Sequence, residues 1–166
     1  MLSVALLAGT LVVLFARMLY SRSTSARSIV DAFAPWALPL AAAVTTTCAL
    51  GSLYFSEIVN YKPCIMCWYQ RTMMYPLAVI LIVAALTKDK KIWRYATPLA
   101  AIGIVFSTYH WFLERFPNLD AGVCDVEVPC EFVWFENFGF VTLPFMALTG
   151  FLAVLVFTTL PNTQKE

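Results

Sequence analysis

Residues 64–86 read CIMCWYQRTMMYPLAVILIVAAL, so two cysteines stand at the beginning of a long apolar run. Between positions 68 and 86 this run holds one charged residue, Arg71. A helix needs about 20 mostly apolar residues to cross the hydrocarbon core of a bilayer. The stretch therefore predicts a membrane helix that begins beside a pair of thiols.

The composition of the whole chain also indicates a membrane protein. Of its 166 residues, 61% are apolar and 13% are charged, a balance that soluble domains do not normally have. Four other apolar runs are long enough for helices, and none alternates with period two as the strands of a membrane barrel do. They cover residues 2–20, 33–55, 96–116 and 138–160. We therefore predict an all-α membrane protein with five spans and a simple loop at residues 21–28.

The basic residues predict the orientation of the helices, because Lys and Arg accumulate in short cytoplasmic loops. Arg22 and Arg27 lie in the first loop, four lysines and arginines fall between positions 88 and 94, and Lys165 lies in the tail. Five spans place these three segments on one side of the membrane, which we assign to the cytoplasm. The N-terminus and the second and fourth loops are then expected outside.

Residues 1–20 have a competing interpretation as a cleaved signal peptide. No basic residue precedes the apolar run, and the run is longer than the core of a typical signal peptide. We therefore predict that this segment stays as a membrane helix. The orientation of the other four helices is the same in either case.

All four paired cysteines fall in the two loops that are expected outside, where the compartment is oxidising and disulfides persist. Cys64 and Cys67 form a C-x-x-C pair, which favours a thiolate at a helix start, and Cys67 directly precedes the span. Cys124 and Cys130 flank a loop without a helix signal, where a disulfide is accessible for exchange. Cys48 lies in the middle of a span and is expected to be a packing residue. The two pairs suggest electron transfer at the membrane surface.

Ionisable side chains in membrane helices are costly and therefore mark candidate functional positions. The candidates are Glu57, Arg71, His110 and Glu114. Arg71 follows Cys67 by four residues and lies on the same face of a helix, where its charge can stabilise a thiolate or an anionic cofactor oxygen. Structural alternatives stay open, because arginines extend to the interface, glutamates form ion pairs, and buried histidines are often hydrogen-bonded core residues.

Several motifs in the sequence resemble those of a known protein family. The string Cys64-Ile-Met-Cys67-Trp-Tyr-Gln-Arg71 resembles the C-x-x-C-x-Y-x-R signature of the DsbB and BdbC family of disulfide bond formation proteins. Residues 109–114, YHWFLE, resemble the third core helix of that family, and the second cysteine pair follows in the expected loop. Residues 142–145, TLPF, resemble the start of its last helix. The resemblance covers residues 33–160.

The resemblance implies a four-helix transmembrane bundle at residues 32–161, in the bacterial plasma (inner) membrane. Residues 1–31 would then be an additional N-terminal transmembrane helix with a cytoplasmic loop, and residues 162–166 a cytoplasmic tail. It also implies an enzyme that oxidises an extracytoplasmic thioredoxin-fold thiol oxidase of the DsbA or BdbD type. The electrons would pass to a membrane quinone, either ubiquinone or menaquinone. No nucleic-acid partner and no metal are expected.

The resemblance also implies a role for each site residue. By motif position, Cys124 takes the attack of the reduced partner and Cys130 is its companion, although the short spacing leaves the order of attack open. Cys67 would be the thiolate beside the quinone, with Cys64 as its disulfide partner. The expected quinone-binding side chains are Arg71, His110 and Trp68.

Other classes of protein remain as alternatives. Four outer cysteines can hold zinc or Cu(I), which would make the chain a membrane metal-binding protein. Two inert disulfides can also staple loops in a structural protein. A vitamin K epoxide reductase-like enzyme shares the helical bundle and the thiol relay, although the string at residues 64–71 fits that family poorly.

Overall fold

The computed structural model describes residues 2–89, 91–120, 122–124 and 127–160, and the predicted tail at residues 162–166, with Lys165, lies outside these ranges. The described chain is mostly helical, as predicted. Its α-helices are α1 (Leu2–Met18), α2 (Thr24–Phe33), α3 (Ala37–Leu53), α4 (Ile65–Thr87), α5 (Trp93–Leu113) and α6 (Leu143–Thr158). Short helical turns are η1 (Ala34–Trp36), η2 (Tyr54–Ile58) and η3 (Pro117–Leu119). An antiparallel hairpin pairs β1 (Glu136–Asn137) with β2 (Val141–Thr142).

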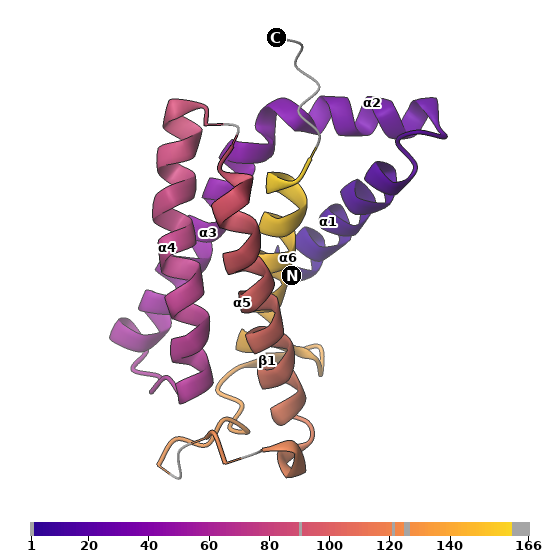
Figure 1. The fold of residues 1–166 in the computed structure, drawn as a ribbon. Helices are drawn as coiled ribbons and strands as arrows, with labels where there is room; N and C mark the ends of the chain where they lie inside the picture. Colours follow the sequence, from indigo (N-terminus) through magenta and orange to yellow (C-terminus); the bar gives the residue numbers. More distant parts are fainter. Residues whose placement is uncertain (1, 90, 121, 125–126, 161–166) are drawn as a thin grey trace.

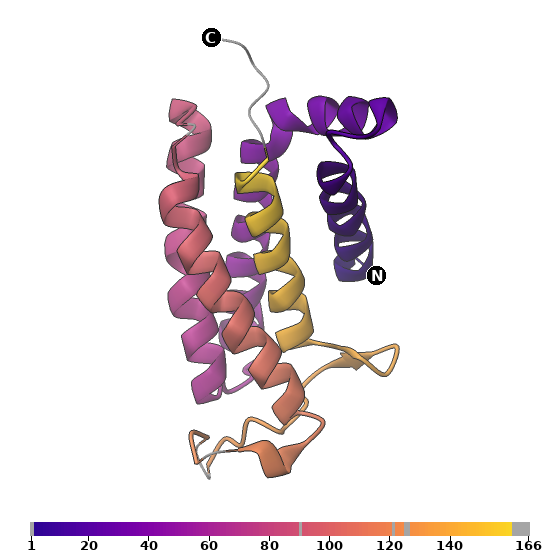
Figure 2. The ribbon, with the colours of Figure 1, turned by 45° about the vertical axis from the view of Figure 1, so that its right-hand side comes forward.

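Helices α3 to α6 form a bundle in which each helix packs against the next and α6 closes against α3. Figure 1 shows these helices side by side, with the loop between α5 and α6 at one end and α2 lying across the other. Helix α1 packs on the outside of α6, as the turned view in Figure 2 shows. A hydrogen bond from the Arg17 guanidinium to the Thr159 hydroxyl joins these two helices. The first helix therefore contacts the bundle through α6.

Small side chains let the bundle helices approach one another closely. The hydrophobic effect contributes little between helices in lipid, so their association depends on van der Waals contact and favours small residues. Ala41 of α3, Ala100 of α5 and Ala153 of α6 are fully buried. They surround larger buried side chains such as Leu77 and Phe151. Cys48 packs against the same apolar core, in agreement with the packing role predicted for it.

Among the described residues, three helical stretches are long and apolar enough to cross a membrane: Thr24–Ile58, Ile65–Thr87 and Trp93–Leu113. Ser3–Met18 and Leu143–Thr158 are also apolar helices, but they are shorter. Each of the five predicted runs therefore contains a helix, whereas length and composition together qualify three stretches as spans.

The simple loop predicted at residues 21–28 was wrong, because α2 begins at Thr24. Apolar residues recur in α2 at helical spacing, and two of them, Ala26 and Val30, are buried in a small cluster with Ala16 of α1. An apolar groove of about 440 Å³ lies between α1 and α2. The helices that line it, α1 and α2, meet at the opposite end of the molecule from the loop between α5 and α6 (Figure 1).

Helix boundaries differ from the apolar runs at the end of the bundle that carries the cysteines. Helix α4 begins at Ile65, earlier than the predicted residue 68, because Cys64 is its N-cap. Helix α6 begins at Leu143 instead of residue 138, because the hairpin occupies the residues before it. Phe138 and Gly139 have positive φ at the tip of this hairpin. A left-handed backbone of this kind is suited to a tight turn between strands.

Candidate active site

The first cysteine pair lies at the N-terminus of α4. Pro63 favours an extended backbone before it, and Cys64 follows as the N-cap with φ of −71° and ψ of 172°. The backbone N–H of Cys67 donates a hydrogen bond to Cys64 Sγ at 3.4 Å, and the two sulfur atoms of these free thiols lie 3.1 Å apart. The position at the helix start that was expected for Cys67 is thus held by Cys64. Cys67 lies within the first turn of α4.

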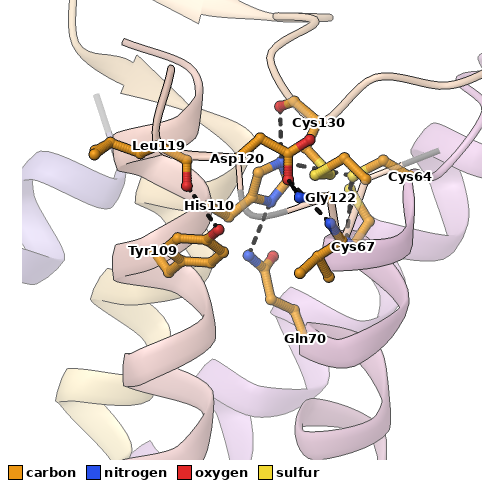
Figure 3. Close-up of a disulfide and its surroundings, with 11 residues drawn as sticks. Cys64, Cys67, Gln70, Tyr109, His110, Leu119, Asp120, Gly122 and Cys130 are labelled. Atoms are coloured by element: carbon orange, nitrogen blue, oxygen red, sulfur yellow. Dashed lines mark hydrogen bonds between the residues drawn. A yellow bond between two sulfur atoms is a disulfide. The ribbon is translucent and has the colours of Figure 1, made fainter. Parts of the chain in front are cut away.

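His110 joins this cysteine pair to the second one. Its Nε2 atom lies 3.5 Å from Cys64 Sγ and 3.2 Å from the carbonyl oxygen of Cys130. Its Nδ1 atom lies 3.1 Å from the side-chain nitrogen of Gln70. Figure 3 shows the imidazole between α4, which carries Cys64, and the loop that carries Cys130. His110 is 3% exposed, so these contacts are made away from water.

The second cysteine pair is closed as a disulfide between Cys124 and Cys130. Cys130 is 2% exposed and is buried in one cluster with Cys64 and Leu113. Cys124 is half-buried and packs at the edge of this cluster. Cys124 is thus the more exposed residue of the two, while Cys130 lies on the side of Cys64.

Aromatic contacts hold the chain after Cys130 over the first cysteine pair. Trp134 stacks on Tyr61, with ring centroids 5.0 Å apart, and Tyr61 stacks in turn on Phe55, with centroids 5.8 Å apart. Phe132 packs edge-on against Trp134 at 4.7 Å. Offset and edge-to-face aromatic pairs of this kind contribute about 0.5–1.5 kcal/mol each beyond their burial. The residues before α4 therefore anchor the cysteine loop.

The electrostatic surroundings favour a thiolate at Cys64. Hydrogen bonding with Cys67 lowers the pKa of Cys64, His110 lowers it further, and burial opposes both effects. Glu114 follows the last residue of α5, and burial raises the pKa of its carboxyl group although His110 and Arg115 lower it. Cys64, Cys67 and His110 line a cavity of about 10 Å³, the size of a single water molecule, together with Glu114 and Trp134.

Arg71 and Trp68 form a separate patch on the side of α4 that faces α3. The Arg71 guanidinium donates hydrogen bonds to the hydroxyl and the carbonyl oxygen of Ser52, at 2.9 and 3.0 Å. Its charged group also lies 5.2 Å from the centre of the Trp68 ring, and Trp68 is 51% exposed. The predicted site residues thus fall into two neighbouring groups, the four cysteines with His110 and the pair Arg71 and Trp68.

Among the other ionisable candidates, Glu114 lies in the cysteine cavity, whereas Glu57 is exposed and accepts a hydrogen bond from its neighbour Ser56. Sequence reasoning missed Gln70, which is buried against His110. A signal for it was present, because Gln70 follows Cys67 by three residues and so lies on the same face of the helix. The stacking of Tyr61 on Trp134 had no such signal, since these residues are far apart in the sequence.

Comparison with known proteins gives a consistent result. Residues 34–160 match the family described as "Disulfide bond formation protein DsbB". The chain is 40% identical over 140 residues to "Disulfide bond formation protein C" of Bacillus subtilis, which covers 83% of this chain and 96% of the relative. It is 45% identical over 108 residues to "Probable disulfide formation protein C 1" of Bacillus cereus, or 64% of this chain and 78% of the relative. No solved structure gives a significant match. The chain belongs to the DsbB family of disulfide bond formation proteins.

Proposed function

We propose that the chain is a thiol:quinone oxidoreductase that supports disulfide bond formation. Its partner is an extracytoplasmic thioredoxin-fold thiol oxidase of the DsbA or BdbD type, and its electron acceptor is a membrane quinone. One observation carries the proposal: a buried imidazole lies within 3.5 Å of both a sulfur atom of the first cysteine pair and the carbonyl oxygen of a cysteine in the second pair. The two pairs are therefore close enough to act as one relay.

The relay begins at the Cys124–Cys130 disulfide. A thiolate of the reduced partner attacks Cys124, the more exposed cysteine, and the bond to Cys130 breaks to leave a thiolate. The second thiol of the partner loses its proton and attacks the partner's sulfur in the mixed disulfide, which breaks the bond to Cys124 and releases Cys124 as a thiolate. The partner leaves as a disulfide, and Cys124 and Cys130 keep the two electrons as a reduced pair. The burial contrast supports Cys124 as the site of attack.

The second half of the relay passes through Cys64. The Cys130 thiolate attacks Cys64 in a Cys64–Cys67 disulfide, which forms a Cys130–Cys64 bond and releases Cys67 as a thiolate. Cys124 then attacks Cys130, which restores the outer disulfide and releases Cys64 as a thiolate. The hydrogen bonds that lower the pKa of Cys64 make it a good leaving group in this step. The first pair is then reduced and the second oxidised, as they are in the structure.

A quinone fits the surface beside Cys67 better than the cysteine cavity. The cavity of about 10 Å³ is far too small for a quinone ring. Arg71 is held by Ser52 through two of its five N–H donors, so donors remain for a quinone oxygen. The exposed Trp68 ring offers an apolar face beside them. We assign Arg71 and Trp68 to the quinone, whether ubiquinone or menaquinone, which would accept two electrons and two protons when bound.

The family resemblance implied that His110 binds the quinone, whereas this proposal gives it a different role. Both of its ring nitrogens contact protein groups, and the side chain is buried. We therefore propose that His110 acts on the cysteines and not as a direct quinone contact.

We propose that all five apolar helices cross the bacterial plasma membrane, with α3 to α6 as the four-helix domain and α1 as the additional span. Helix α2 would then lie along the cytoplasmic surface, because it runs across the end of the bundle opposite the cysteine loop (Figures 1 and 2). This arrangement places the N-terminus outside, the C-terminus in the cytoplasm, and both cysteine pairs on the extracytoplasmic side. Cysteine-accessibility labelling of intact cells tests this orientation with an Arg22→Cys variant. Labelling of that cysteine from outside would contradict the orientation.

A metal-binding function is less compatible with the contacts of His110. Cys64, Cys67 and His110 offer three ligand atoms within 4.8 Å of one another, whereas Cys124 and Cys130 are joined to each other. However, a carbonyl oxygen faces Nε2 of the imidazole and an amide nitrogen faces Nδ1, so neither nitrogen presents a free lone pair. An inert pair of disulfides and an epoxide-reducing enzyme have no specific observation in their favour.

The proposal is tested by quinone reduction with the purified protein in detergent. The protein is supplied with a reduced thioredoxin-fold dithiol oxidase and either ubiquinone or menaquinone, and quinone absorbance is followed. We expect turnover that is lost in Cys124→Ala and in Cys67→Ser and is kept in Cys48→Ala, whose side chain only packs in the core. Absence of turnover in the unmodified protein with both quinones, together with bound zinc, would favour the metal site.

A further inference from the structure

Gln70 and Cys130 together determine which nitrogen of His110 carries the proton. The side-chain nitrogen of Gln70 is a donor only, so Nδ1 of His110, 3.1 Å away, accepts a hydrogen bond from it. The carbonyl oxygen of Cys130 is an acceptor only, so Nε2, 3.2 Å away, donates. The two contacts come from different parts of the chain, α4 and the cysteine loop. Both select the same neutral tautomer, with hydrogen on Nε2.

We propose that Gln70 is a positioning residue, which holds His110 in the Nε2–H tautomer so that one imidazole N–H serves both cysteine pairs. This N–H points to the Cys130 carbonyl and lies 3.5 Å from Cys64 Sγ. Gln70 is itself 8% exposed and contacts neither cysteine through the hydrogen bonds described, so it acts through the imidazole. The importance of this arrangement for electron flow rests on the proposed function, but the tautomer itself does not.

The tautomer has two chemical consequences. His110 is a hydrogen-bond donor to a thiolate at Cys64 and is not the base that removes the proton of that thiol. A proton added at Nδ1 would meet the N–H of Gln70, with two donors facing each other. The same N–H holds the Cys130 segment near Cys64, so His110 orients the two sulfur-bearing segments. Protons that the thiols release therefore leave by another route.

The titratable groups around the imidazole do not fix Nδ1. Cys64 lies 3.5 Å from Nε2, Cys67 and Arg71 lie further along α4, and Glu114 and Arg115 lie beyond the end of α5. The cysteine loop and the start of α6 line the cavity with groups that do not titrate, among them Pro129, Phe132, Leu143 and Pro144. Gln70 is thus the side chain that fixes Nδ1 as an acceptor, while the Cys130 carbonyl fixes Nε2 as the donor.

A direct test is possible because His110 is the single histidine of the chain. The protein is labelled with ¹⁵N-histidine, purified through a tag without histidine, and examined by NMR in detergent between pH 6 and 8. We expect the neutral imidazole to have an unprotonated Nδ1 and a protonated Nε2. An Nδ1–H tautomer of the neutral ring would overturn the proposal even if every variant failed to fold.

Two substitutions at position 70 have opposite expected effects. Gln70→Leu removes the donor to Nδ1 and leaves the imidazole held only through Nε2, so the acid dissociation constant of the Cys64 thiol falls about tenfold. Gln70→Glu instead accepts a hydrogen bond from a protonated Nδ1 and so favours the charged ring while the Nε2–H remains, and the apparent pKa of Cys64 therefore decreases further. Thiolate absorbance is titrated in a background in which Cys48 and Cys67 are alanine and the outer disulfide is intact.

Thr72→Ala is the matched control, because Thr72 is exposed on the same helix and bonds only to the carbonyl of Tyr69 among the contacts described. It should leave both the NMR spectrum and the titration unchanged. Shifts of the same sign in Gln70→Leu and Gln70→Glu would mean that Gln70 has only a packing role, and would overturn the proposal. A protein with the expected tautomer but without quinone turnover would instead refute the proposed function and leave the tautomer assignment standing.

Discussion

Gly103 of α5 packs against Phe151 of α6 without room for a larger side chain. A Cβ atom at this position would lie 2.3 Å from the Phe151 ring, while ordinary contact begins at 3.4 Å, so the approach is 1.1 Å too short. Phe151 is fully buried in the bundle core and has little room to move. Overpacking of this kind costs about 1–3 kcal/mol, and the gain in helix propensity from glycine to alanine offsets roughly 0.5–1 kcal/mol of it.

We therefore expect Gly103→Ala to lower the free energy of unfolding by about 1–2 kcal/mol. Gly103 precedes His110 by seven residues, about two helical turns, so a displaced α5 also moves the imidazole away from Cys64 and slows quinone reduction. Thermal unfolding in detergent, followed by circular dichroism, measures the first effect. The turnover assay measures the second.

Gly51→Ala in α3 is the matched control, because no atom lies within 4 Å of a Cβ built at that position. It should be as stable as the unmodified protein or slightly more so. Adding Phe151→Leu to Gly103→Ala should recover part of the loss, since the smaller side chain removes the clash. Equal unfolding temperatures for Gly103→Ala and Gly51→Ala would refute the packing argument.

Three further predictions concern the site. Arg71→Ala should raise the KM for quinone about tenfold. Arg71→Lys should restore the KM only in part, because lysine lacks the planar set of donors that holds Ser52. An unchanged KM in steady-state kinetics would exclude the quinone assignment. Because burial raises the pKa of Glu114, its contribution to stability is largest below the unfolded-state pKa and is lost as pH rises through the folded-state pKa. Glu114→Gln should accordingly flatten the pH dependence of the unfolding temperature between pH 5 and 8, and equal slopes would contradict this. Trp134→Ala removes the stack on Tyr61, worth about 0.5–1.5 kcal/mol, and should slow transfer between the cysteine pairs several-fold in stopped-flow kinetics without changing the KM for quinone.

Local patterns in the sequence predicted much of this architecture. The apolar runs predicted the long helices, because in lipid the backbone must satisfy its own hydrogen bonds. The string from Cys64 to Arg71 predicted the family, which the match over residues 34–160 confirms. Helix α2 was missed because polar residues dominate positions 21–28, the segment in which it begins, although Ala26 and Val30 follow helical spacing.

Contacts between distant segments could not be predicted in the same way. The sequence indicated that His110 is a candidate, but its partners Gln70 and Cys130 lie forty residues before it and twenty residues after it. Nothing local to Tyr61 indicates that Trp134 stacks on it. The start of α4 at Ile65 depends on the N-cap at Cys64, a feature that an apolar run does not show.

The central claim is that the two cysteine pairs form one relay through Cys130 and Cys64. The most direct measurement uses a variant with Cys48→Ala, Cys67→Ser and Cys124→Ser, which leaves only Cys64 and Cys130 as thiols. Mild oxidation should rapidly form an intramolecular Cys64–Cys130 disulfide, detected by mass spectrometry of the linked peptides. A matched variant that keeps Cys124 in place of Cys130 should form its bond with Cys64 much more slowly. A faster bond to Cys124, or no bond in either variant, would contradict the relay.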